Sequence, residues 1–241
     1  MKALEQDLIP YSSSPLPEGP WLVFAPHADD ETFGMGGAIL LATAAGMDIY
    51  VDVVTDGRAG GDGSDALVHS RQQEAMDACS ILGAKPPHFW GVSDRSVEAT
   101  AEWIAIASQR IDEIKPKSLF FPSAFELHPD HRAVAFLVWE GAEQCGYSGR
   151  ILSYEISVQG VINLLLDTTL VVDQKQDVMR VYCSQLGENN YLDVIRSLDR
   201  MRTYTLPEKT TAAEGFYEYS LSGRGSFEAQ VVRSVRSYLE L

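Results

Sequence analysis

The chain has 241 residues, and its 34 acidic and 19 basic side chains give a formal net charge of −15 at pH 7. A surface of this charge repels phosphate backbones and anionic membranes, so no nucleic-acid partner is expected. Hydrophobic residues make up 45% and charged residues 22% of the chain, which is typical of a globular protein with a sizeable core. No apolar stretch approaches the roughly 20 residues of a membrane span, so no membrane-spanning helix is expected.

The three cysteines, Cys79, Cys145 and Cys183, lie far apart in the sequence. This spacing offers neither a disulfide framework nor a Cys-x-x-Cys metal site, and buried structural thiols are expected instead. The first residues contain no basic segment followed by an apolar one, so the sequence predicts no secretory signal. These observations favour a cytoplasmic protein, and a homo-oligomer is compatible with them.

Residues 1–20 are rich in proline and serine and are predicted to form an extended lead-in to a single domain over residues 21–241. Strand and helix patterns then alternate. In chain order, the expected elements are a strand at 22–25, a helix at 36–45, a strand at 49–55, a helix at 65–82, a strand at 88–90, a helix at 100–114, a strand at 118–121 and a helix at 131–145. This alternation predicts an α/β protein with a Rossmann-like three-layer fold, a mostly parallel sheet and helices on both faces.

The alternation is less regular beyond residue 150. Two segments with strand character, 151–157 and 169–173, come before a helix expected around 174–186 and a strand-like segment at 214–221. Gly225 then precedes an amphipathic helix. The apolar face of this helix is formed by Phe227, Val231, Val232, Val235 and Leu239.

A polar cluster, Pro26-His27-Ala28-Asp29-Asp30-Glu31, directly follows the strand expected at 22–25. Its imidazole and carboxylates can hold a divalent metal and leave one carboxylate as a base. The same carboxylates could instead cap the following helix, because side-chain oxygens satisfy its first N–H groups. The cluster alone supports metal binding and capping about equally, and Glu31 is the member expected to cap.

A second cluster, His128-Pro129-Asp130-His131, follows the strand expected at 118–121. Pro129 suits the first position of a helix, where the positive end should keep His131 neutral and able to bind a metal. Taken alone, a surface turn with Asp130 as a cap is the favoured alternative. Both clusters, however, follow strands of one parallel sheet and should meet at its carboxyl edge. Two histidines and an aspartate there make up a hydrolytic zinc site.

Two glycine-rich segments have competing interpretations. Gly34-x-Gly36-Gly37 does not have the Gly-x-Gly-x-x-Gly spacing of a dinucleotide-binding loop, and close packing of a helix on a strand explains it better. The loop at 56–63 contains four glycines and is expected to be either a lid over a substrate or a flexible surface loop.

At this point the sequence resembles the PIG-L/LmbE-like zinc-dependent de-N-acetylases, over about residues 20 to 220. The stronger matching motifs are Pro26-His27-x-Asp29-Asp30-Glu31, Gly34-x-Gly36-Gly37, Thr55-Asp56-Gly57, Arg71-x-x-Glu74 and His128-Pro129-Asp130-His131. The softer ones are Asp173, Lys175, Tyr182-x-Ser184-Gln185 and Ala213-Glu214-Gly215-Phe216. Ala28 stands where the family usually has proline, which affects the rigidity of the loop and removes no ligand.

The resemblance implies that His27, Asp30 and His131 bind zinc and that Asp29 is the general base. Neighbouring side chains on a turn diverge, which agrees with separate roles for Asp29 and Asp30. A zinc ion lowers the pKa of its bound water towards about 7, so that a carboxylate can take the proton.

The resemblance assigns His128 as the acid that protonates the leaving amine, and Asp130 is expected to orient His128 and keep it charged. Arg71 and Asp94 are implied to lie at the rim of the pocket and to bind sugar hydroxyls. A surface salt bridge is an equally good interpretation of each.

These inferences predict a metal-dependent hydrolase that removes the N-acetyl group from an N-acetylglucosamine-type sugar or sugar conjugate. Zn²⁺ is the expected cofactor, and Fe²⁺ suits the same ligands. One alternative is a zinc amidase acting on a non-sugar acetamide. Another is a non-catalytic metal-binding module on the same fold, although such a module would need neither Asp29 as a base nor His128 as an acid.

Overall fold

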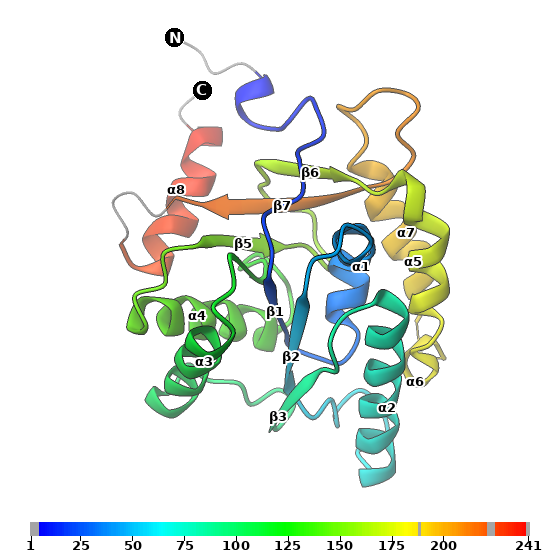
Figure 1. The fold of residues 1–241 in the computed structure, drawn as a ribbon, viewed down its shortest axis with the longest axis vertical. Coiled ribbons are helices and arrows are strands. Elements are labelled where there is room, and N and C mark those ends of the chain that lie inside the picture. Colours follow the sequence, from blue (N-terminus) through cyan, green and yellow to red (C-terminus); the bar gives the residue numbers. More distant parts are fainter. Residues whose placement is uncertain (1–4, 188, 221–224, 240–241) are drawn as a thin grey trace.

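The computed structural model describes residues 5–187, 189–220 and 225–239, and its centre is a seven-stranded sheet with the order β3-β2-β1-β4-β5-β7-β6 (Figure 1). The strands are β1 (Trp21–Ala25), β2 (Ile49–Thr55), β3 (His88–Val92), β4 (Ser118–Pro122), β5 (Arg150–Tyr154), β6 (Leu164–Asp167) and β7 (Ala213–Tyr219). The first five strands pair in parallel, and β7 pairs antiparallel with both β5 and β6. The sheet is therefore mostly parallel, as predicted.

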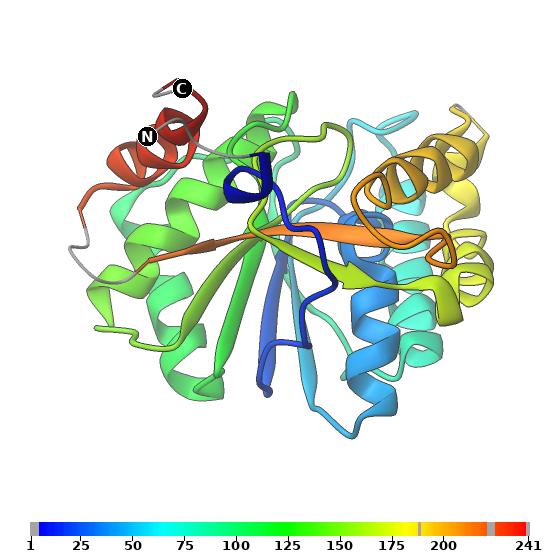
Figure 2. The same ribbon diagram turned by 90° about the horizontal axis from the view of Figure 1, so that it is seen from above.

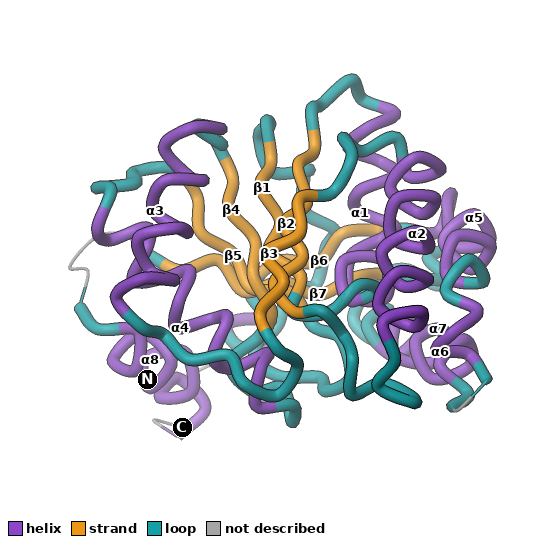
Figure 3. Tube along the Cα trace, turned by 90° about the horizontal axis from the view of Figure 1, so that it is seen from below, coloured by secondary structure: helices purple, strands orange, loops and turns teal. Residues whose placement is uncertain are grey.

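Helices cover both faces of the sheet and complete three layers (Figures 2 and 3). The helices are α1 (Asp30–Ala44), α2 (Asp65–Leu82), α3 (Ala101–Ile114), α4 (Pro129–Gln144), α5 (Val172–Met179), α6 (Cys183–Leu186), α7 (Tyr191–Met201) and α8 (Phe227–Leu239). Apolar residues of α1, α2, α5 and α7 form the core on one face, and those of α3, α4 and α8 form the core on the other. This arrangement confirms the predicted α/β class.

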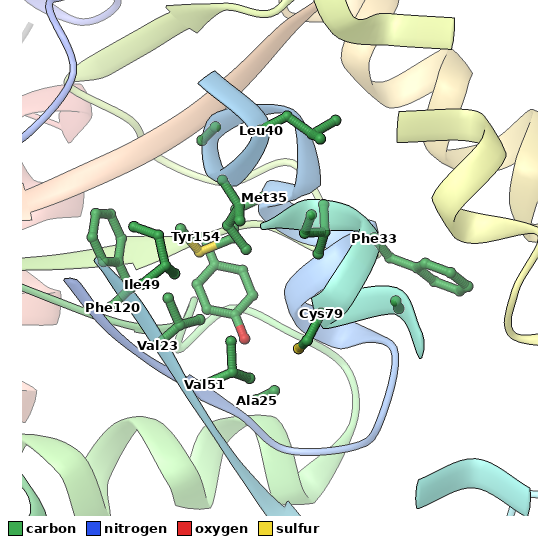
Figure 4. Close-up of a cluster of buried hydrophobic side chains, with 14 of the residues drawn as sticks. Val23, Ala25, Phe33, Met35, Leu40, Ile49, Val51, Cys79, Phe120 and Tyr154 are labelled. Atoms are coloured by element: carbon green, nitrogen blue, oxygen red, sulfur yellow. The ribbon is translucent and has the colours of Figure 1, made fainter. Parts of the chain in front are cut away.

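The central strands β1 and β4 are apolar on both sides because helices cover both faces of the sheet there. All five residues of β1 and all five of β4 are buried, which is why each appears in the sequence as a short hydrophobic run. Figure 4 shows Val23 and Val51 beneath α1, close to Met35 and the ring of Tyr154. The Tyr154 hydroxyl donates a hydrogen bond to the carbonyl oxygen of Phe24 at 2.9 Å, so this buried phenol is satisfied.

The loops that follow β1 and β4 leave the sheet at a topological switch point. These strands are neighbours, yet α1 lies on one face of the sheet and α4 on the other (Figure 2). The chain therefore diverges above the carboxyl ends of β1 and β4 and leaves a crevice between the loops. The two polar clusters of the sequence occupy these loops, as predicted.

Helix α1 begins six residues earlier than predicted. Glycines at 34, 36 and 37 disfavour a helix, but tight packing overrides this preference. A Cβ on Gly34 would lie 2.5 Å from the Tyr154 ring and 2.6 Å from the Glu155 carbonyl oxygen, and one on Gly37 would lie 2.7 Å from Thr168. The glycines thus allow close packing of the helix, which confirms the prediction made for this motif.

The C-terminal third departs furthest from the prediction. The segment expected at 169–173 is no strand: the Asp167 carboxylate accepts a hydrogen bond from the N–H of Thr169 at 3.0 Å and ends β6 just before it. The helix expected at 174–186 is two helices, α5 and α6, because the chain turns and inserts the fully buried Tyr182 into the core. Helix α7 was not predicted, although Leu192, Ile195 and Leu198 have helical spacing.

The termini are described in part. Within the lead-in that was expected to be extended, residues 5–7 form a short 3₁₀ helix. Further along, the chain meets β6, where the N–H of Ser14 donates to the carbonyl oxygen of Leu165 at 2.7 Å. Strand β7 confirms the strand expected at 214–221, whose last residue lies outside the described part. Helix α8 lies where it was predicted, with Phe227 buried but Val232 exposed, and the side chain of Leu239 lies outside the description. No described helix has the length and apolar character needed to span a bilayer.

Only one of the three cysteines is a buried thiol. Cys79 lies in the core beneath α1 (Figure 4), Cys145 is partly buried and Cys183 is exposed. The prediction of buried thiols is therefore wrong for Cys183, which sits at the first position of the short helix α6.

Candidate metal centre and catalytic pocket

The turn after β1 fixes the directions of two adjacent aspartates. Asp29 has a φ of 149°, outside the regions that L-residues usually occupy, so its side chain and that of Asp30 leave the chain in different directions. The Asp30 Oδ2 atom accepts a hydrogen bond from the N–H of His27 at 2.9 Å and thereby closes the turn. The strained residue lies where the sequence predicted a base beside a ligand.

Three atoms from the two clusters meet above the ends of β1 and β4. His27 Nδ1 lies 3.1 Å from Asp30 Oδ2, His131 Nε2 lies 3.2 Å from Asp30 Oδ2, and the two nitrogen atoms are 3.2 Å apart. Ligand atoms around a tetrahedral zinc ion, each about 2.0 to 2.1 Å from the metal, lie about 3.3 Å from one another. The donor set and its spacing therefore fit a small divalent cation with one open position.

Carboxylates stand behind both histidines. His27 Nε2 faces Asp94 Oδ1 and Asp130 Oδ2, each at 3.4 Å, and His131 Nδ1 faces Glu126 Oε2 at 3.8 Å. Carboxylates in these positions take the N–H of an imidazole and direct the other ring nitrogen towards a metal. Neither His27 Nε2 nor His131 Nδ1 has a short hydrogen bond, so the carboxylates are the partners available to them.

Glu126 was not predicted from the sequence. It is buried, and its carboxylate accepts hydrogen bonds from the N–H groups of Ile156 at 2.7 Å and Ser157 at 3.1 Å. Although burial opposes ionisation, the nearby His131 ring and the hydrogen bonds from Ser157 and Ile156 hold the pKa of Glu126 below its usual value. The one feature of the sequence that could have pointed to Glu126 is its position two residues before His128.

The protonation of His131 differs from the prediction. His131 was expected to be neutral because of the helix terminus. Burial does favour the neutral ring, but Asp30 and Glu126 outweigh it and raise the pKa of His131 to about 9. The carboxylates of Asp130, Asp30 and Asp94 likewise raise the pKa of His27 against the effect of burial. A cation bound between these rings would displace a proton.

Asp29 does not join the cluster of His27, Asp30 and His131, because its carboxylate is bonded to Arg71. The Asp29 Oδ2 atom accepts a hydrogen bond from Arg71 Nη2 at 3.1 Å, and burial raises the pKa of the carboxyl to about 7, opposed by the positive charge of Arg71. A carboxylate that titrates near neutral pH is suited to accept and release a proton. Glu31, the expected cap, instead accepts hydrogen bonds from the hydroxyls of Tyr182 and Thr32 inside the core.

His128 and Asp130 do not form the expected pair. His128 caps α4, and its Nδ1 atom accepts the N–H of Asp130 at 3.2 Å, which leaves Nε2 as the protonated nitrogen of the neutral ring. The Asp130 carboxylate lies 3.9 Å from that Nδ1 and accepts hydrogen bonds from the backbone N–H groups of Arg95 and Val97. Burial and then the positive charge on His27 lower the pKa of His128, contrary to the expectation that Asp130 keeps it charged.

His128 is also near enough to share a cation with the other histidines. It forms one possible metal-binding group with His27 and His131 and another with His27, Asp94 and Asp130. Its Nδ1 atom is already bonded to the backbone, however, and its ring meets that of His27 edge-on at 4.6 Å. We therefore favour Asp30, whose oxygen is within 3.2 Å of both other donors.

The cluster forms the floor of a cavity of about 350 Å³. The loops after β1, β2, β3 and β4 line it on the sheet side, and Tyr191, Val194 and Ile195 of α7 line it on the other. Its volume lies at the lower end of the range for small-molecule sites. Because α7 was not predicted, this apolar wall was not predicted either.

Arg71 and Asp94 both line the cavity, but neither is in a surface salt bridge. Arg71 is 3% exposed and also donates to the carbonyl oxygens of Gly57 at 3.0 Å and Ala28 at 3.2 Å. Asp94 faces His27 and accepts the N–H of Ala59 at 3.0 Å. These contacts attach the loop at 56–63 to the lining of the cavity, and its two interpretations, a lid over a substrate and a flexible surface loop, both stay predictions.

The architecture defines a three-layer α/β protein with a histidine–aspartate metal-type site at the switch point of its sheet. The model of the family described as "PIG-L: GlcNAc-PI de-N-acetylase" matches residues 22–142, half of the chain. The chain therefore belongs to the PIG-L family, as its motifs predicted. Both proposed ligand clusters fall within the matched segment.

One relative agrees with this assignment by sequence, and a solved structure shares the fold. The chain is 26% identical over 177 residues to the probable N-acetyl-alpha-D-glucosaminyl L-malate deacetylase 2 of Bacillus cereus, covering 69% of this chain and 80% of that protein. The N,N′-diacetylchitobiose deacetylase of Pyrococcus horikoshii matches with a TM-score of 0.75 and 22% identity, covering 85% of each chain.

The fold is also shared by a protein of another activity. The 4-carboxy-2-hydroxymuconate hydratase GalB of Pseudomonas putida matches with a TM-score of 0.72 and 21% identity, covering 86% of this chain and 95% of that one. The architecture alone does not select the reaction, so the reaction has to be argued from the site.

Proposed function

We propose that this protein is a metal-dependent de-N-acetylase that hydrolyses the acetamide of an N-acetylglucosamine-type sugar or sugar conjugate. The observation that carries the proposal is the triangle formed by His27, Asp30 and His131, with Asp29 beside it, in a chain of the PIG-L family. Family relatives with named substrates, GlcNAc-malate in one and diacetylchitobiose in another, remove acetyl groups from N-acetylglucosamine units.

We assign the metal ligands as His27, Asp30 and His131, and the general base as Asp29. When bound, zinc or a similar ion lowers the pKa of a water molecule and polarises a carbonyl group. Asp29 accepts the proton of the attacking water, a role supported by its pKa of about 7. Arg71 holds the Asp29 carboxylate in place and, through Gly57, also fixes the adjoining loop.

We assign His128 as the group that assists the departing amine. Because Nδ1 accepts a backbone N–H, its protonated Nε2 is free to donate a hydrogen bond to the developing oxyanion. This N–H stays on the ring, and the leaving amine takes the proton that Asp29 has removed from the attacking water, so that the proton count balances. Asp130 acts as a positioning residue for His27, since its carboxylate is held by two backbone N–H groups and faces His27 Nε2.

Zinc is the proposed ion, and iron(II) suits the same two imidazoles and carboxylate. Cytoplasmic localisation, the single domain over residues 21–241 and a homo-oligomer stay predictions. The lid movement of the loop at 56–63 also stays a prediction, since its contacts show where it lies and not whether it opens.

The proposal is tested by measuring the metal content of the purified protein and the amine released from N-acetylated sugars. We expect His131→Ala to lose both the ion and the activity. Asp29→Asn should keep the ion and lose activity by a factor of about 10² to 10⁴. A His131→Ala variant with full metal content and unchanged deacetylation would show that the ligand assignment is wrong.

A further inference from the structure

Arg95 is an exposed cation on the lining of the catalytic cavity. It follows Asp94 in the loop after β3, and its own N–H donates to the Asp130 carboxylate at 2.6 Å. The residue is therefore attached through its backbone to the group that faces the proposed ligand His27. This contact fixes the start of the side chain while leaving the guanidinium group unconstrained.

The backbone of Arg95 adopts a conformation that favours glycine. Its φ is 63°, and the N–H of Ser96 closes the turn by donating to the carbonyl oxygen of Ser93 at 3.1 Å. Asparagine, aspartate and glycine adopt this region more readily than arginine does. A strained position that presents a long charged side chain to a cavity suggests that the side chain has a function there.

The two arginines of the cavity differ in their partners. Arg71 is buried and donates to Asp29, Ala28 and Gly57, so its charge is committed to the protein. The Arg95 guanidinium group, in contrast, has no hydrogen bond or ion pair to any residue that the structure describes. This free cation stands out in a chain with a net charge of −15.

We propose that Arg95 binds a negatively charged oxygen group on the substrate and makes this enzyme selective for N-acetylglucosaminyl conjugates with an anionic aglycone. The inference rests on the proposed function, because it places the acetamide at the metal centre and the aglycone at the mouth of the cavity. A planar guanidinium group binds carboxylates and phosphates by paired hydrogen bonds. In a protein this acidic, such a group offsets the repulsion that an anionic substrate would meet.

The test compares three glycosides of N-acetylglucosamine. One has a neutral methyl aglycone, one has a hydroxy-dicarboxylate aglycone, and the third is the 1-phosphate. We expect the wild-type protein to have a higher kcat/KM for at least one anionic glycoside than for the neutral one. Arg95→Gln should lower that ratio about tenfold, and Arg95→Lys should lower it less. The two anionic glycosides distinguish a carboxylate from a phosphate ligand.

Arg180→Gln is the matched control. It removes one positive charge from an exposed arginine on the edge of α5 that pairs with Asp177 and does not line the cavity. The control should leave the ratio unchanged. If Arg95→Gln also leaves it unchanged, or if the wild-type protein shows no preference for either anionic glycoside, the proposal is overturned.

A binding measurement separates this proposal from the proposed function. Calorimetry with metal-loaded Asp29→Asn protein measures the affinity for each glycoside without turnover. Tighter binding of an anionic glycoside, lost on adding Arg95→Gln, supports the role of Arg95 even if no glycoside is deacetylated. Equal affinity for all three glycosides overturns it even if deacetylation is observed.

Discussion

Two neighbouring aspartates show how strongly position determines the chemistry of one residue type. The imidazole of His131 and that of His27 hold the pKa of Asp30 well below its usual value, against the effect of burial. One residue earlier, burial raises the pKa of Asp29 to about 7. The sequence predicted their divergence, since adjacent side chains on a turn point apart. The environments that make them unequal come from residues far along the chain.

The three proposed ligands could be found from sequence because each follows a recognisable strand. Glu126 could not, because its meaning depends on Ile156 and Ser157, whose N–H groups hold it some thirty residues further on. The pairing of Asp130 with His128 was mistaken for a related reason. In the folded turn, the backbone N–H of Asp130 is the nearer partner of that imidazole.

Glu126 provides a test of the residues behind the metal ligands. We expect Glu126→Gln to weaken zinc binding by about 10- to 100-fold, because it removes the negative charge that faces His131 Nδ1. Competition with a chromogenic chelator measures this affinity. Glu113→Gln, an exposed change on α3, is the control and should have no effect. Equal affinities in the two variants would argue against a role for Glu126 at the metal centre.

At the scale of an element, α1 is two helical segments joined at a break. Met35 departs from helical geometry, with φ −145° and ψ 23°. Just beyond it, the N–H groups of Gly37 and Ala38 donate to the Glu214 carboxylate of β7 at 2.8 and 2.7 Å. Glu214 therefore caps the second segment from another element, and Lys175 Nζ, itself buried, lies 2.8 Å from it.

The contacts between these residues could not be predicted from the sequence. Lys175 and Glu214 were noticed as motif matches, but a separation of nearly forty residues hides an ion pair. The early start of α1 was not predicted, because glycines disfavour a helix when its packing against other elements is unknown. Packing against Tyr154 and the cap from Glu214 reverse that preference.

We expect Glu214→Ala to lower the free energy of unfolding by about 3 kcal/mol or more. The change leaves two helix N–H groups without a partner and removes one of the two carboxylates around the buried Lys175. Urea denaturation measures the loss. Glu218→Ala on the same strand breaks a half-exposed pair with Arg150 and should cost less than about 1 kcal/mol. Similar losses in both variants would contradict the capping role.

For the whole molecule, the alternation of strands and helices was enough to predict the parallel part of the sheet, β1 to β5. It placed both polar clusters at one edge, because parallel strands must share a direction. The C-terminal part escaped this reasoning, since β6 is four residues long and β7 runs antiparallel. As a result, the sequence predicted the catalytic floor of the cavity but not the wall formed by α7.

The three cysteines should report on the integrity of the whole fold. Burial raises the pKa of the Cys79 thiol, so the reactive thiolate form is scarce at neutral pH. The same burial keeps a reagent from reaching the sulfur. In the native protein we expect Cys183 to react fast with a thiol reagent, Cys145 more slowly and Cys79 only on unfolding. Labelling followed by peptide mapping measures the order. Reaction of Cys79 at the rate of Cys183 would show that the core opens locally.

The spacing of the proposed ligands along the chain affects how firmly the two helical layers are held together. His27 and His131 are 104 residues apart in sequence. His27 lies in the loop before α1 and His131 in the first turn of α4, and these two helices pack on opposite faces of the sheet. An ion held by both would act as a reversible cross-link across that division, and it would stabilise the folded state because its binding site exists only there. Loss of the ion would then loosen the molecule along the seam between its two helical layers, at the place where substrate enters.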